Sequence, residues 1–124
     1  MADPKKILLQ TTIPTTEDDW SVARFSLLGA LLREQRGAAG NPLYDVTMRD
    51  RDPPGGCDTV LWIIDRSDFD QLWLFAVDLT GALTATDVAG IEAFRRRGGG
   101  LLATRDHFDM GACLSKLSGI GVAH

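Results

Sequence analysis

The chain has few of the features that mark several common protein classes. It contains only two cysteines, Cys57 and Cys113, which lie far apart and outside any metal-ligand spacing. A disulfide framework is therefore not expected, and a reducing, cytoplasmic setting fits the sequence better. Basic residues do not outnumber acidic ones, since the formal net charge is -4, and this removes electrostatic support for nucleic-acid binding.

Long apolar runs are also lacking. No stretch is long enough to span a membrane, and the opening residues MADPKKILLQ lack the long apolar core of a signal peptide. Neither an internal repeat nor a low-complexity segment is present. The 124 residues are 44% hydrophobic and 24% charged, which is typical of an ordinary globular protein with one domain.

Strand-like and helix-like patterns alternate along the chain. They predict strands at residues 6–10, 44–48, 71–77 and 100–104, and helices at about 15–35, 84–97 and 110–117. The third strand is ambiguous, because TVLWIID at 59–65 is as apolar as the run at 71–77. We favour 71–77, since a short loop then leads directly into the next helix. The earlier run is left as an extended segment, a short helix or an extra edge strand.

Local signals place the ends of the helices. Thr15 or Thr16 can cap the first helix, and Thr84, with Thr86 as its rival, can cap the second within T-A-T-D. Gly98 is placed to end the second helix.

The three tryptophans stand in apolar runs and are expected in the core. Helical spacing gives the first helix an apolar stripe made of Trp20, Ala23, Leu27, Leu28 and Leu31.

Alternating strands and helices predict the fold class α/β, with a flavodoxin-like three-layer α/β/α arrangement and a mainly parallel sheet. Ligands bind such sheets at the carboxyl ends of the strands. Several of these ends carry polar residues, and we expect the site where they meet: Thr11, Thr12, Asp78, Arg105, Asp106 and His107.

Two segments carry a family resemblance: SDFDQLWLFAVD and DVAGIEAFRRRGGGLLATRDHFDMG. They resemble the class I glutamine amidotransferase-like superfamily, including its trehalose-utilisation-like (ThuA-like) and DJ-1-like branches. The likeness spans residues 6–117 and is strongest over 67–111. It implies a sharp strand-to-helix turn, the nucleophile elbow, which carries cysteine in catalytic members. Asp106 stands at that position here, so cysteine chemistry is not implied, and Cys113 is expected to be a buried apolar residue.

The residues around the elbow allow a hydrolase or a binding site, and they also allow Asp106 a purely structural role as a helix cap. Asp106, held ionised by backbone N–H groups of the following helix, could act as nucleophile or general base with His107 in a hydrolase. Alternatively, Asp106 only caps that helix. Binding without turnover would use Thr11, Thr12, Asp78, Arg105 and Asp109 to hold a small polar molecule.

Because the elbow lacks cysteine, we expect ligand binding or subunit association, with the hydrolase as the alternative. No cofactor is expected. No metal is expected either, because D-H-x-D at 106–109 is not a dedicated metal motif and a second histidine is missing unless His124 folds back.

The resemblance also bears on assembly. Members of the superfamily continue with further strands after the elbow helix, whereas this chain stops at SGIGVAH. Residues 1–124 are therefore expected to be one domain that is truncated after the elbow helix, as an incomplete N-terminal portion. An uncovered edge strand favours association, so we expect a homo-oligomer or a second chain that completes the sheet.

Overall fold

Four parallel strands form the centre of the molecule. They are β1 (Lys5–Thr11), β2 (Tyr44–Arg49), β3 (Gln71–Ala76) and β4 (Gly100–Arg105). All pair in parallel, in the order β2-β1-β3-β4, so the flavodoxin-like α/β class is confirmed. The computed structural model describes residues 3–12, 22–52, 58–76, 83–105 and 112–118.

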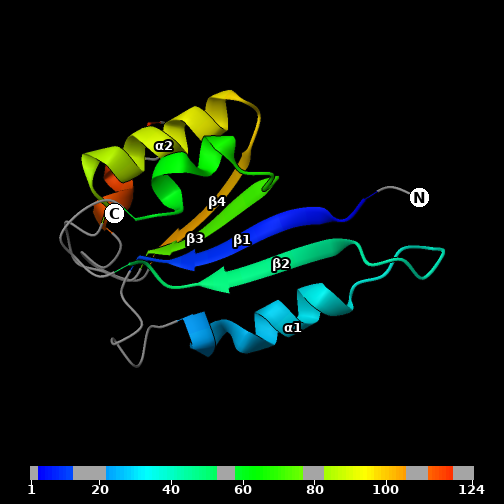
Figure 1. Cartoon of the computed structure of the whole chain (residues 1–124). Coiled ribbons are helices and arrows are strands. Elements are labelled where there is room, and N and C mark those ends of the chain that lie inside the picture. The colour runs from blue at the N-terminus through cyan, green and yellow to red at the C-terminus, as the bar shows by residue number, and fades with distance from the viewer. Residues whose placement is uncertain (1–2, 13–21, 53–57, 77–82, 106–111, 119–124) are drawn as a thin grey trace.

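Helices lie on both faces of this sheet (Figure 1). A short 3₁₀ turn, η2 (Val22–Phe25), leads into α1 (Ser26–Glu34) on one face. On the other face lie α2 (Ala85–Arg96) and the 3₁₀ helices η3 (Leu61–Arg66) and η4 (Ala112–Lys116). None of the described helices is long and apolar enough to cross a membrane.

The strands separate two apolar cores, because neighbouring side chains point to opposite faces. Within β1, Leu8 packs beneath α2, whereas Ile7 and Leu9 pack on the side of α1. Strand β3 repeats the alternation, with Leu74 beneath α2 and Phe75 on the α1 side.

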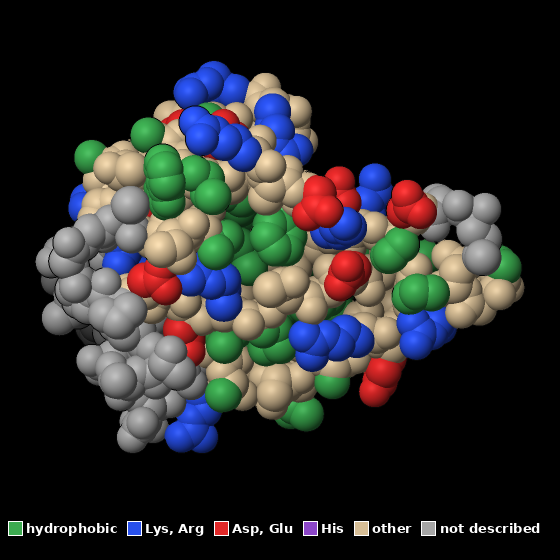
Figure 2. All heavy atoms as spheres, viewed as in Figure 1, with side chains coloured by type: hydrophobic (Ala, Val, Ile, Leu, Met, Phe, Trp, Pro, Cys, Tyr) green, Lys and Arg blue, Asp and Glu red, His purple; other side chains and the backbone are tan. Residues whose placement is uncertain are grey.

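Over the face seen in Figure 2, acidic and basic side chains are interspersed rather than gathered by sign.

The predicted ends of the second helix are confirmed. Thr84 is the N-cap of α2, and it exchanges hydrogen bonds with Asp87 in a capping box. Gly98 follows the last turn with φ of 103°, a conformation that glycine adopts without strain. In the middle of α2, Gly90 lies directly against the backbone of Leu61 and Trp62, so η3 and α2 touch where a side chain is missing.

The apolar stripe predicted for the first helix is correct at Leu28 and wrong at Ala23, Leu27 and Leu31, while Trp20 lies outside the described residues. Leu27 and Leu31 are 85% and 55% exposed, whereas Leu32 is buried and Leu28 packs against the α1-side core. The helix begins at Ser26, and the proposed caps at residues 15 and 16 lie outside the described residues. Contact with the sheet determines which side of the helical segment is buried. The Phe25 ring, just before α1, stacks on the Phe75 ring of β3, with 4.4 Å between the ring centroids.

Residues 61–66 form η3, so the short-helix alternative for the run at 59–65 is correct. Because i and i+3 share a side of a 3₁₀ helix, Leu61 and Ile64 both enter the core. Trp62 then points outward and is 41% exposed, which contradicts its predicted core position. Trp73 is half-buried. The predicted third helix is a 3₁₀ helix in its described part, and Cys113 is buried as expected.

Candidate functional site at the carboxyl edge of the sheet

The carboxyl ends of the parallel strands meet at one edge of the sheet, which we call the carboxyl edge. Thr11 ends β1, pairs in register with Phe75 of β3, and is buried together with Thr12. Arg105 ends β4, two strands away from β1. The other predicted site residues lie outside the described residues: Asp78, Asp106, His107 and Asp109.

Asp50 is the first residue after β2, and it joins two segments at this edge. The Thr11 hydroxyl donates to its Oδ1 at 2.6 Å, and the backbone N–H of Val22 donates to the same oxygen at 2.6 Å. Within the described part of the chain, Oδ2 of this half-buried carboxylate is left to accept further hydrogen bonds. The chain therefore presents an acceptor beside the two threonines at the end of its central strand.

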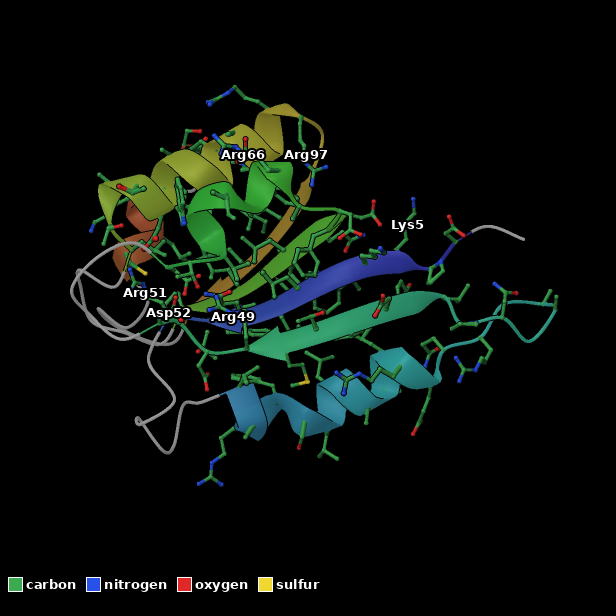
Figure 3. The ribbon with its side chains drawn as sticks, viewed as in Figure 1. Lys5, Arg49, Arg51, Asp52, Arg66 and Arg97 are labelled. Atoms are coloured by element: carbon green, nitrogen blue, oxygen red, sulfur yellow. The ribbon has the colours of Figure 1, made fainter. Side chains whose placement is uncertain are left out.

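A charged network lies next to Asp50. The Arg49 guanidinium donates to Asp58 at 2.5 Å, to Asp52 at 3.0 Å and to the Gln10 amide oxygen at 2.8 Å. The Gln10 amide group in turn donates to Asp58 at 3.1 Å. Figure 3 shows Arg49, Arg51 and Asp52 together at the ends of β1 and β2, whereas Lys5 and Arg97 lie toward the opposite end of the sheet.

A second ion pair connects this network to α2. The buried Arg51 guanidinium donates to Asp87 at 2.5 Å, and the other oxygen of Asp87 accepts the backbone N–H of Asp58 at 2.6 Å. Asp87 also accepts the backbone N–H of Thr84, which completes the capping box of α2. One carboxylate thereby joins the end of β2, the start of η3 and the first turn of α2.

Hydrogen bonds lower the pKa of two carboxyl groups in the network, Asp52 and Asp58. Burial alone would raise the pKa of Asp58, but hydrogen bonds from the backbone N–H groups of Asp52, Leu61 and Val60, followed by the bond from Arg49, outweigh it and lower the pKa. The pKa of Asp52 is lowered chiefly by the side-chain and backbone hydrogen bonds of Thr59.

The chemistry open to this edge follows from these contacts. Both guanidiniums already face carboxylates that balance their charge, so the edge offers little net positive charge to an anionic ligand. In the described ranges, no group of three or more His, Cys, Asp or Glu residues is arranged to hold a metal ion. The edge is thus suited to accepting hydrogen bonds more than to neutralising an anion.

Comparisons with known proteins add no further assignment. No family model matches the chain, nor does any curated protein or solved structure. The arguments about function therefore rest on the contacts described above.

Sequence reasoning missed most of these polar residues, because it placed the site at the ends of the first, third and fourth strands and not at the end of the second. The available signal was the alternation of Arg49, Asp50, Arg51 and Asp52 directly after a strand. In a parallel sheet, such charges stand at the ligand-binding edge. Their partners, Asp58 and Asp87, lie too far along the chain for spacing to reveal the pairs.

Proposed function

We propose that the carboxyl edge binds a small polar molecule that presents hydrogen-bond donors, at the end of β1. The observation that carries this proposal is the Thr11–Asp50 pair, in which a buried hydroxyl orients a half-buried carboxylate beside Thr12. Ordering these groups before a ligand arrives lowers the entropic cost of binding.

The position of the pair supports the same proposal. From β1 the chain crosses the α1 side to reach β2, whereas from β3 it crosses the α2 side to reach β4. The topological switch therefore lies between β1 and β3, and open α/β sheets bind ligands outside the carboxyl ends at that point. Thr11 stands there, paired with Phe75.

The charges decide the class of ligand. Arg49 and Arg51 are bound to Asp58 and Asp87, whereas Asp50 has accepting capacity left within the described part. A neutral polyol or an amine can donate to that carboxylate, but a phosphate or sugar acid would be repelled by it. The proposed ligand is therefore neutral or cationic.

In this proposal the domain is a member of the class I glutamine amidotransferase-like superfamily that binds instead of using a cysteine nucleophile. The parallel sheet and its strand order support that placement. Asp78, Arg105 and Asp109 would add polar groups from the ends of β3 and β4. A hydrolase using Asp106 and His107 is distinguished by Asp106→Asn, which should abolish hydrolysis with little loss of stability. If Asp106 only caps a helix, the same change is neutral, because Asn caps equally well.

The test is thermal unfolding with one sugar scaffold in four forms: neutral, amine-bearing, carboxylate-bearing and phosphorylated. A ligand at one hundred times its Kd stabilises by about 2.7 kcal/mol, which raises Tm by several degrees. We expect shifts with the neutral or amine form, lost in Asp50→Asn. Asp45→Asn is the matched control. Asp45 is exposed near the amino end of β2, the strand that Asp50 follows. A shift that survives Asp50→Asn would contradict the site, and a shift only with the anionic forms would contradict the ligand class.

A further inference from the structure

The two edge strands of the sheet, β2 and β4, differ in how their outer backbone groups are protected. At the β2 edge, the Arg33 side chain from α1 donates to the backbone oxygen of Val46 at 2.9 Å. That strand also carries the charged residues Asp45 and Arg49. Side chains that occupy backbone groups and charges along a strand are devices that keep an edge from pairing with another chain.

Among the described residues, no side chain binds the outer backbone of β4, and the only charged residue of this strand is Arg105 at its end. Residues 100–104, GLLAT, carry no charge and no proline, and among the described strands β4 pairs only with β3. Within the described part of the chain, the outer backbone groups of β4 therefore have no partner strand. Leu102, at the centre of this strand, is 44% exposed. An uncharged, apolar edge strand is a template for pairing.

The sheet face beside this edge is also unevenly covered. On the α2 side, Leu101 and Ala103 pack against the core formed with α2, η3 and η4. On the α1 side, among the described residues, α1 packs mainly on β2, and Phe25 extends this cover to Phe75 of β3. Both faces of an all-parallel sheet are normally covered. The apolar surface of Leu102 is therefore left beside the open edge.

We propose that β4 pairs antiparallel with β4 of a second copy of this chain, about a two-fold axis near Leu102. A two-fold contact places the same strand on both sides, so it requires a strand that can face itself. GLLAT meets this requirement because self-pairing brings no like charges together. Leu102 then packs against its equivalent, and the two four-stranded sheets become one continuous sheet.

Exposure of a leucine does not by itself indicate an interface. Leu27 is more exposed than Leu102, but it lies on α1, whose backbone hydrogen bonds are made within the helix. Leu102 combines exposed apolar surface with a position on the outermost described strand of the sheet. This difference makes Leu27 a matched control, because the same residue type can be changed in both places.

The experiment is sedimentation velocity of the full chain over a range of concentrations, for the wild type, Leu102→Lys and Leu27→Lys. We expect a dimer for the wild type and for Leu27→Lys, and half that mass for Leu102→Lys. Thr104→Lys, an exposed position on the same strand, is the second variant if Leu102→Lys does not fold. Hydrogen exchange should show β4 amides protected in the dimer and not in the monomeric variant.

Two results would overturn the proposal. A wild type that stays monomeric at every concentration would show that β4 does not pair with itself. A dimer that dissociates with Leu27→Lys and survives both β4 variants would place the interface on α1. Neither result depends on whether the carboxyl edge binds a ligand, since that is measured by the shift in Tm within each variant.

Discussion

Asp58→Asn tests the charged network most directly. Asp58 is fully buried and accepts five hydrogen bonds, from Arg49, Gln10 and the backbone N–H groups of Asp52, Val60 and Leu61. Asparagine keeps the size of the side chain, but it removes the charge and turns an NH₂ group toward N–H donors. Donor then faces donor, and the Arg49 guanidinium loses its buried counter-charge.

The size of the effect can be bounded from the structure. Breaking a buried ion pair by removing one partner costs about 3–5 kcal/mol. Arg49 is 20% exposed and keeps Asp52 and Gln10 as acceptors, so part of this loss is recovered. We expect a loss of about 2–4 kcal/mol in the free energy of unfolding, which lowers Tm by roughly 10 °C for a chain of this length.

The loss should also depend on pH, with a sign set by the lowered pKa of Asp58. The native carboxylate stays ionised below the unfolded pKa of about 3.9. The stabilisation that the Asp58 carboxylate gives to the folded state is therefore fully present above that pH, and it is lost as the pH falls through the folded pKa. The gap in Tm between wild type and Asp58→Asn should be large at pH 7 and should narrow in acid.

Thermal and urea unfolding at several pH values measure both effects, with Asp45→Asn as the control. Asp45 is exposed on β2, so the same substitution should change the unfolding free energy by no more than about 0.5 kcal/mol. If Asp58→Asn is as mild as the control, or if its gap in Tm is unchanged in acid, the network does not stabilise this edge as argued.

Two further predictions concern the helices. Gly90→Ala should destabilise by about 1–3 kcal/mol in urea unfolding despite the better helix propensity of alanine, because its Cβ would lie 2.2 Å from the backbone oxygen of Leu61. Gly29→Ala should lose less than half as much, since its Cβ meets the flexible side chain of Met48, and equal losses would contradict this reasoning. Thr84→Ala should cost about 1 kcal/mol by removing the N-cap of α2, and an unchanged Tm would show that Thr84 is dispensable.

The parts of the fold that the sequence predicts well are those with local causes. Thr84 and Gly98 mark the ends of α2 because a cap and a left-handed residue act within one turn of the helix. The predicted α1 stripe was correct at Leu28 but wrong at Leu27 and Leu31, because the segment offers two leucine pairs at helical spacing, Leu27 with Leu31 and Leu28 with Leu32. The choice between them was made by contacts with distant strands, which a pattern within the helix does not contain.

The contrast between local signals and tertiary contacts also explains why η3 could not be predicted. The apolar run at 59–65 matched a strand as well as a helix, and Asp58 decides between them by accepting the N–H groups of Val60 and Leu61 at the start of a turn. Asp58 is itself held by Arg49 and Gln10, which belong to β2 and β1. Local structure here follows from a tertiary ion pair, so sequence spacing could not have revealed it.

For the candidate site, the sequence predicted the position and the two threonines, Thr11 and Thr12, but not Asp50. Alternation of strands and helices was enough to place it at the carboxyl edge, and Thr11 lies there. Asp50 was overlooked because its importance comes from the Thr11 hydroxyl, a partner on a neighbouring strand. Acidic residues in loops have many possible partners, and only the register of β1 with β2 selects this one.

The two proposals are compatible because pairing uses the outer edge of β4 along its length, whereas the binding site uses the carboxyl ends of the strands. The Thr11–Asp50 pair lies at the ends of β1 and β2, whereas β4 forms the other edge. Antiparallel pairing of two β4 strands makes the parent sheets run in opposite directions, so their carboxyl edges face away from each other. Each site would then be built from one chain alone. Dimerisation would cover the apolar edge without joining the two sites.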